Sequence, residues 1–357
     1  FDDIVQVGQR TLLYRDLFTV SWLLGRFCNY RCSYCWPYAR SDKKDHRPTE
    51  LCLRTIDEIK RQARENGFNS FHFSLSGGEP TFHPGYLDIL SYLASDVGNT
   101  NYTSIHMTSN CSRPMKWFET YVESAKSFHR ASITASLHTE HLNTREKMQD
   151  FADKLVLCQE HDVQVTINMV MVPEWFEKDW DNAMFFHEQG INVTLKPQSD
   201  PTASRVVDGY SDDMKQRLYN GMPQMAYTEV KRKWADRPKP NFQIPQNIQG
   251  QNDKSVPWHM QVEFTDSKGK KWYMDQAERF NAFNFNNFKG WQCNAGYSGI
   301  IIREPDGSVK RSYSCHDVPL GNIETGFKLF NKPQPCITGS CVSSADSKIP
   351  KRKTDVL

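Results

Sequence analysis

Short runs that alternate apolar and polar residues are separated by longer stretches with helical periodicity between about residues 19 and 198. The alternating runs that predict strands are residues 19–25, 70–76, 103–109, 131–137, 163–172 and 192–197. The first helical stretch begins at Thr49 and stops at Gly67, a residue type that commonly ends helices. About eight strand–helix units close a full TIM barrel, so six units predict an α/β fold with a partial, open (β/α)6 barrel of TIM type. A doubly wound open sheet is the competing topology.

The pattern divides the chain into five parts: an N-terminal segment 1–16, the partial barrel 17–200, a bridging region 201–290, a small C-terminal module 291–345 and a basic tail 346–357. The bridging region is rich in Pro, Gln and Asn, and contains one hairpin-like run at 260–274. The C-terminal module carries a second hairpin signal, with turn residues at Asp306 and Gly307. We expect the tail to be disordered.

Composition narrows the classes of function. Apolar residues make up 38% of the 357 residues, enough for a core, and the formal net charge is only +2. So small a charge gives no electrostatic reason to expect nucleic acid or an anionic membrane as the main partner. No apolar run approaches the ~18 residues of a membrane span, and the first 25 residues do not resemble a signal peptide. We therefore expect a cytoplasmic protein, in which cysteines are more often metal ligands or core thiols than disulfides.

Three cysteines follow the first predicted strand in one short loop: Cys28, Cys32 and Cys35. A loop of this length can curl around a metal centre with its sulfurs pointing inward. On a four-iron cluster, three thiolates leave one iron without a protein ligand, open to a small molecule, as in catalytic metal sites. A zinc or redox knuckle is the alternative, although the nearest downstream ligands, His46 and Cys52, lack the zinc-knuckle spacing.

A second motif, Gly77-Gly78-Glu79-Pro80, ends the second predicted strand. Two glycines allow a ligand to approach the backbone closely, and Glu79 can accept hydrogen bonds from an ammonium group. A tight turn without any ligand is the alternative for this motif taken alone.

Together these motifs resemble those of the radical S-adenosylmethionine (radical SAM) enzymes. Cys28, Cys32, Tyr34 and Cys35 fit the family's C-x3-C-x-aromatic-C motif, and the GGEP turn follows one unit later. The resemblance implies a [4Fe-4S] cluster with one open iron, chelated by the amino nitrogen and carboxylate of SAM. It also implies that Gly77 to Pro80 hold the amino group of SAM. A flavodoxin or ferredoxin would supply the electron that cleaves SAM to a 5′-deoxyadenosyl radical, which abstracts hydrogen from substrate.

Other polar residues stand at predicted strand ends. By the resemblance, Ser109 and Asn110 contact SAM, Ser136 contacts its ribose, and Tyr34 packs near adenine. His138, Lys196 and Gln198 are candidates for contact with substrate, His138 and Lys196 as catalytic residues. Except for Tyr34, which belongs to the cysteine loop, ordinary strand-end polarity is the alternative for these residues.

Four further cysteines lie in the last quarter of the chain: Cys293, Cys315, Cys336 and Cys341. Four thiolates can complete a cluster or a zinc site. Their order around the hairpin resembles the auxiliary-cluster modules called twitch and SPASM, which implies a second [4Fe-4S] cluster. Cys315 is the least secure ligand, because seven residues separate it from Gly307 where the SPASM pattern usually has four, and His316 is a possible substitute. Lone Cys52, Cys111 and Cys158 are expected to be core thiols.

We therefore expect an enzyme that abstracts hydrogen from a small polar metabolite, in an oxidation or a rearrangement. Modification of a ribosomally made peptide is the alternative, disfavoured because only 27 residues precede Cys28, too few for a leader-binding domain. Two non-catalytic classes also compete: an iron–sulfur electron carrier, which needs no ammonium-binding turn, and a zinc-binding interaction module.

Overall fold

The computed structural model describes residues 2–9, 16–36, 38–201, 205–223, 262–274, 285–303, 306–315, 319–341 and 343–354. Its strands are β1 (Ile4–Gln9), β2 (Leu17–Leu23), β3 (Ser70–Ser76), β4 (Tyr102–Ser109), β5 (Arg130–Leu137), β6 (Val163–Met171), β7 (Asn192–Pro197), β8 (Val262–Asp266), β9 (Lys271–Met274), β10 (Gln292–Cys293), β11 (Gly299–Ile302), β12 (Ser308–Lys310), β13 (Pro319–Asn322), β14 (Gly326–Phe327), β15 (Gln334–Pro335) and β16 (Lys351–Arg352). Its helices are α1 (Thr49–Glu65), α2 (Tyr86–Ser95), α3 (Met115–Ala125), α4 (Arg145–Glu160), α5 (Phe176–Glu188), α6 (Asp212–Asn220) and α10 (Ser344–Ser347), with 3-10 turns η1 (Pro80–Phe82), η2 (Val97–Asn99) and η3 (Pro173–Trp175).

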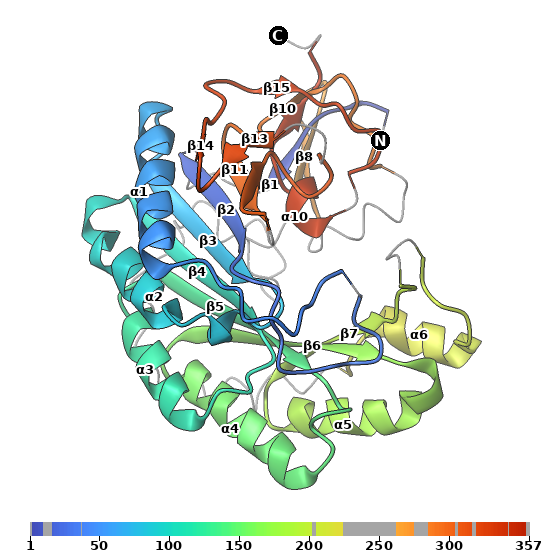
Figure 1. Cartoon of the computed structure of the whole chain (residues 1–357). Coiled ribbons are helices and arrows are strands. Elements are labelled where there is room, and N and C mark those ends of the chain that lie inside the picture. Colours follow the sequence, from blue (N-terminus) through green and yellow to red (C-terminus); the bar gives the residue numbers. More distant parts are fainter. Residues whose placement is uncertain are drawn as a thin grey trace.

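Strands β2 to β7 lie side by side in sequence order, and each is parallel to its neighbour. Helices α1 to α5 cover one face of this sheet, which curves around the opposite, concave face (Figure 1). A doubly wound sheet would reverse its strand order and carry helices on both faces. The structure therefore has the mixed α/β fold with a parallel sheet that the six strand–helix units predict, and it excludes the doubly wound alternative.

Alternation along each strand decides which side chains face the helices. In β3, Phe71, Phe73 and Leu75 are buried, whereas the intervening polar residues are only partly buried. The buried set packs with apolar residues of α1 and α2 in one core, which stabilises the sheet by removing apolar surface from water. Gly67 ends the first helix region with φ +86°, a conformation in which a Cβ is unfavourable. The helix boundary predicted there is confirmed.

The C-terminal strands extend the same sheet. β11 runs parallel to β2, and β12, β13 and β14 follow as antiparallel neighbours, so the sheet has ten strands within the described residues. Both hairpins expected from the sequence are present, β8–β9 and β11–β12.

A second sheet has the order β15-β10-β16-β1-β8-β9. Its strand β16 belongs to the basic tail, and it pairs with β1 on one side and β10 on the other. Buried Lys351 donates to the carbonyls of Asp346 and Ile349. The expectation that the tail is disordered is therefore wrong for these residues, because their backbone groups find partners in strands distant in sequence. None of the described helices is long and apolar enough to cross a membrane.

Candidate active site

The cysteine loop and the GGEP turn are held together by their backbones. Gly78 N donates to Gly25 O at 2.8 Å, and Glu79 N donates to Phe27 O at 2.6 Å. A Cβ on Gly78 would lie 2.3 Å from the carbonyl oxygens of both Arg26 and Phe27. A glycine is therefore required at position 78 because the two loops approach each other closely there. From the sequence, the glycines of this turn were expected to allow the approach of a ligand.

Glu79 has a carboxylate that is 1% exposed and surrounded by donors. Its Oε1 accepts from Thr81 N, Thr81 Oγ1 at 2.7 Å and Ser109 Oγ at 2.8 Å, and its Oε2 accepts from Asn110 N at 2.6 Å. Burial raises the pKa of Glu79, while the bonds from Asn110, Thr81 and Ser109 lower it. Glu79 thus joins the ends of β3 and β4. Ser109, predicted to contact SAM, is 2% exposed and donates to Glu79.

Asn110 connects this network to the cysteine loop. Its Nδ2 donates to Asn29 Oδ1 at 2.9 Å and lies 3.9 Å from Cys28 Sγ. An N–H aimed at a cysteine sulfur stabilises that sulfur as a thiolate. The structure thus places Asn110 beside Cys28, and its predicted contact with SAM stays a prediction.

The loop after β5, residues 138–141, contacts the cysteine loop from the other side. Glu140 accepts from Ser33 Oγ at 2.6 Å and from Ser33 N, and His141 Nε2 accepts from Arg31 N at 3.2 Å. The ring of Tyr30 stacks on His141 with centroids 4.1 Å apart and planes 4° apart. These contacts fix the backbone between the first and third cysteines.

Tyr34 and His138 meet at the same place. Tyr34 Oη lies 2.8 Å from His138 Nδ1, and the Tyr34 hydroxyl also hydrogen-bonds the side chain of Cys32. Burial lowers the pKa of His138 to about 4, so its ring is neutral near pH 7. The two side chains thus meet at the cysteine loop, and their predicted contacts with adenine and substrate stay predictions.

Asp179 of α5, which was not predicted as a site residue, anchors the loop of residues 138–141. Thr139 Oγ1 donates to Asp179 Oδ1 at 2.9 Å, and Asp179 is 1% exposed. Burial raises the pKa of Asp179 to about 6. Glu140, His141 and Asp179 were missed because their partners are distant in sequence. The only local signal is the polar run His138-Thr139-Glu140-His141 at a strand end.

The three thiols of the loop are protonated as free groups. Burial raises the pKa of Cys28 and of Cys35, and that of Cys32 to about 12. Metal binding at these sulfurs would therefore release protons. In the described part of the chain, no three His, Cys, Asp or Glu side chains converge around a position the size of a single ion.

The four C-terminal cysteines are each at most 4% exposed. The neighbouring thiol of Cys336 lowers the pKa of Cys293, and the cations Lys351 and Arg311 add to the effect. Arg311 donates to the carbonyls of Ala295 and Pro335. Burial, with a smaller contribution from Cys293, raises the pKa of Cys315 and that of Cys341 to about 11. His316 lies outside the described residues. Cys52, Cys111 and Cys158 are buried in the main core, as expected.

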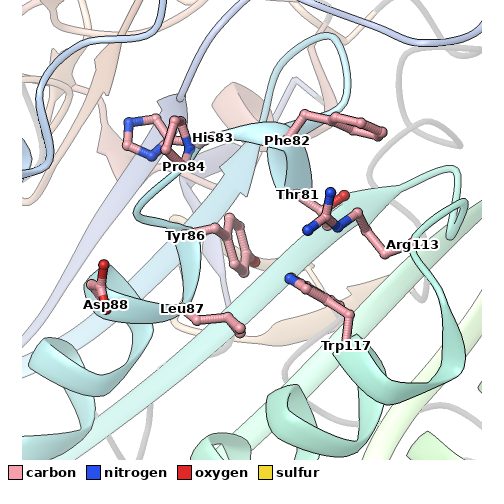
Figure 2. Close-up of a pocket in the computed structure, with 9 residues that line it drawn as sticks. All are labelled: Thr81, Phe82, His83, Pro84, Tyr86, Leu87, Asp88, Arg113 and Trp117. Carbon is pink, nitrogen blue, oxygen red and sulfur yellow. The ribbon is translucent and has the colours of Figure 1, made fainter.

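Other predicted site residues line the concave face. Ser136 pairs in register with Asn168 of β6, and Lys196 of β7 pairs with Val170. Gln198 donates its backbone N–H to the Tyr210 hydroxyl at 2.7 Å. A separate cavity of about 330 Å³ lies on the helix side of the GGEP turn, where Arg113 and Trp117 face Thr81 and Tyr86 (Figure 2). It contains none of the predicted ligands.

Comparison with known proteins agrees with this geometry. Residues 22–187 match the family described as the Radical SAM superfamily. Native anSMEcpe with bound AdoMet is 14% identical, with a TM-score of 0.50 over 87% of this chain and 79% of that chain. The same protein with bound AdoMet and Cp18Cys peptide is 12% identical, with a TM-score of 0.52 over 87% and 78%. These likenesses concern the fold alone. Coproporphyrinogen III oxidase (HemN) from Escherichia coli aligns over 59% of this chain and 52% of its own, at 12% identity and a TM-score of 0.39, too low to carry an argument. No curated protein matches the chain.

Proposed function

We propose that this chain, whose residues 22–187 form a radical SAM superfamily domain, is an enzyme that abstracts hydrogen from a small polar metabolite. A [4Fe-4S] cluster with bound SAM, reduced by a flavodoxin- or ferredoxin-type donor, would supply the 5′-deoxyadenosyl radical. The protein contributes binding, orientation and exclusion of competing reactions.

Cys28, Cys32 and Cys35 would hold the cluster. The donor set fits, because thiolates are the usual ligands of iron–sulfur clusters. Tyr34 hydrogen-bonds Cys32, and Asn110 Nδ2 lies near Cys28, so polar groups already face two of the sulfurs. Hydrogen bonds to cluster sulfurs are one of the means by which proteins adjust a cluster's reduction potential.

The GGEP turn would bind the amino end of SAM. Oε1 of Glu79 already accepts three hydrogen bonds, whereas Oε2 accepts only one, from Asn110, in the part of the chain that the structure describes. A carboxylate offers about four acceptor positions in all, and backbone carbonyls add others. We propose that the backbone carbonyls of this turn bind the ammonium group of SAM and that Glu79 fixes their orientation.

One observation carries this proposal: the backbone interlock of Gly78 and Glu79 with Gly25 and Phe27. It fixes the GGEP turn, the proposed amine-binding element, beside the three-thiol loop at the carboxyl ends of adjacent parallel strands. An electron carrier needs the thiols but not the turn, so the interlock favours catalysis over transport of electrons.

The C-terminal cysteines are proposed to hold a second cluster. Lys351 and Arg311 are buried beside them, 2% and 3% exposed, and both donate to backbone carbonyls. A group of thiolates would offset the cost of burying these two cations. The pairing of Cys293 with Cys336 is the contact that supports the assignment.

The test is production of 5′-deoxyadenosine from SAM by the reconstituted, reduced protein. Cys32→Ala should abolish it, whereas Cys158→Ala, a change of a buried core thiol in α4, should retain it. Unchanged production by Cys32→Ala would refute the assignment. Joint replacement of Cys28, Cys32 and Cys35 by Ala should leave about half of roughly eight irons per chain. A colourless triple variant would refute the second cluster.

A further inference from the structure

The cavity of about 330 Å³ on the helix side of the GGEP turn lies between the first turn of α2 and the start of α3 (Figure 2). Its apolar lining includes Phe82, Tyr86, Leu87 and Trp117. Sites for small molecules typically measure about 300–1,000 Å³ and combine such a lining with a few polar groups. The cavity therefore has the size and lining of a site for a small ligand, and the proposed function does not use it.

Arg113 supplies the cationic group of this cavity. Its guanidinium carbon lies 5.1 Å from the centroid of the Phe82 ring, a contact that orients the guanidinium but accepts none of its N–H groups in a hydrogen bond. The Nε of Arg113 is buried and has no hydrogen-bond partner within the described residues. Buried polar groups in folded proteins almost always have partners. The missing acceptor at the cavity wall therefore indicates an anionic ligand.

The turn that carries Arg113 is fixed by its own side chains. Cys111 has φ +52°, and its backbone N–H donates to Ser109 Oγ at 2.9 Å. The backbone N–H of Ser112 donates to Asn110 Oδ1 at 3.0 Å. The backbone beside Arg113 is thus ordered before any ligand arrives, which lowers the free-energy cost of binding.

The other ionisable groups of the lining leave the charge of Arg113 in place. Asp88 is exposed and lies at the end of the cavity away from Arg113 (Figure 2). Both ring nitrogens of His83 contact backbone groups, and burial lowers its pKa to about 4, so the ring is neutral near pH 7. The nearby carboxylate of Glu79 is already met by its own donors. Attraction for an anion is therefore concentrated at the Arg113 end.

Trp117 and Tyr86 form a firm apolar wall next to this cation. Their ring centroids lie 5.6 Å apart, and Trp117 also stacks on Tyr121, with centroids 5.7 Å and planes 10° apart. The exposed fractions are 8% for Trp117 and 1% for Tyr86. Such a wall favours an apolar group, because contact with it removes apolar surface from water.

We infer that this cavity binds a small carboxylic acid with a short apolar body, its carboxylate on Arg113 and its apolar part against Trp117 and Leu87. A single guanidinium matches the two oxygens of a carboxylate, whereas a phosphate dianion would need further cations that the lining does not contain. The inference goes beyond the proposed function, because the cavity lies on the helix side of the GGEP turn and the radical chemistry is proposed for the concave side. The acid is thus a ligand distinct from SAM and substrate.

The experiment is calorimetry on the full chain with 3-phenylpropanoate as the probe. Its amide, 3-phenylpropanamide, lacks the charge, and acetate lacks the apolar body. We expect 3-phenylpropanoate to bind about tenfold more tightly than either compound. Arg113→Gln should remove this preference, and Arg113→Lys should retain part of it because the charge remains. Lys116→Gln, a change of an exposed lysine in the first turn of α3, is the control and should leave binding unchanged.

Leu87→Trp fills the cavity while leaving Arg113 in place, so it should also abolish binding, and it repeats the test should Arg113→Gln fail to fold. Equal binding of the acid and its amide, unchanged binding by Arg113→Gln or by Leu87→Trp, or displacement of the acid by SAM would overturn the inference. Production of 5′-deoxyadenosine is assayed separately. Production without binding of the acid leaves the proposed function standing and refutes this inference, and binding without production does the reverse.

Discussion

The carboxylate of Glu140 receives both hydrogen-bond donors of Ser33, the hydroxyl at 2.6 Å and the backbone N–H at 3.0 Å and 3.1 Å from the two oxygens. The partners are 107 residues apart in sequence, so the contact ties the loop after β5 to the loop that carries the cysteines. It lies at the surface, where charge-assisted bonds are weakened by solvent.

Glu140→Ala should therefore loosen the cysteine loop without unfolding the protein. We expect a cost of about 1 kcal/mol in loop ordering, seen as a several-fold faster loss of iron to a chelator. Glu140→Gln keeps an acceptor for Ser33 and should restore most of the retention. Glu146→Gln, an exposed change at the start of α4, is the control. Equal iron loss from Glu140→Ala and wild type would contradict the anchoring role.

Gly78→Ala tests the interlock between the two loops. Because the new Cβ would meet two carbonyl oxygens at 2.3 Å, the loops must separate, at a cost of about 3 kcal/mol. Urea unfolding should show this loss together with weakened SAM binding. Gly98→Ala provides the comparison, since nothing lies within 4 Å of its Cβ position. If both variants unfold at the same urea concentration, the interlock is not what holds the loops.

Glu79→Gln places an amide N–H₂ among four donors. We expect destabilisation of about 2–4 kcal/mol, because a buried acceptor is replaced in part by a donor that has no acceptor to meet. Ser109→Ala, which removes one donor, should cost only about 1 kcal/mol. Thermal unfolding of both variants, with exposed Glu119→Gln for reference, measures the difference. A reversed order would show that Glu79 does not organise the network.

His106 predicts a pH dependence of stability. Its folded pKa is about 4, lowered by burial and then by Arg130 and Lys348, whereas the unfolded value is about 6.5. Since the unfolded chain binds the proton first, stability is unaffected above pH 6.5 and falls as the pH drops toward 4. His106→Gln should recover about 1–2 kcal/mol of that loss at pH 5. Urea unfolding at pH 7 and pH 5 checks this, and an unchanged pH 5 to pH 7 difference in the variant would contradict it.

Local pattern was sufficient for the parallel sheet. The six predicted strands begin within two residues of β2 to β7. They could be predicted because the alternation of apolar and polar residues and the helix-ending glycines are local features of the sequence. It was not sufficient for β10, β15 and β16, which contain two residues each and exist through pairing with distant strands. Two residues carry no periodicity.

The same distinction, between features visible in neighbouring residues and features that depend on distant parts of the chain, applies to the site. Spacing identified the cysteine loop and the GGEP turn, since both are contiguous motifs. It did not identify Tyr313, whose position beside Ser21 and Ser76 depends on β11 pairing with β2 across the chain. Nor did it show that the hydroxyl of Ser109 donates to buried Glu79. Polar residues at strand ends look alike in sequence, and only the fold separates those that face a ligand from those that hold one another.

The place of β16 between β1 and β10 has a consequence for biosynthesis. Strands β2 to β7 emerge from the ribosome in the order in which they pair, so that sheet can assemble during translation. β1 emerges earlier still, and β8 can cover one of its edges, but its other edge has no partner until the last described strand is made. Until then that edge is open to pairing with other chains. The second sheet is therefore completed only after synthesis of β16, its last described strand. Pairing with β16 then covers the edge of β1 that could otherwise pair with other chains.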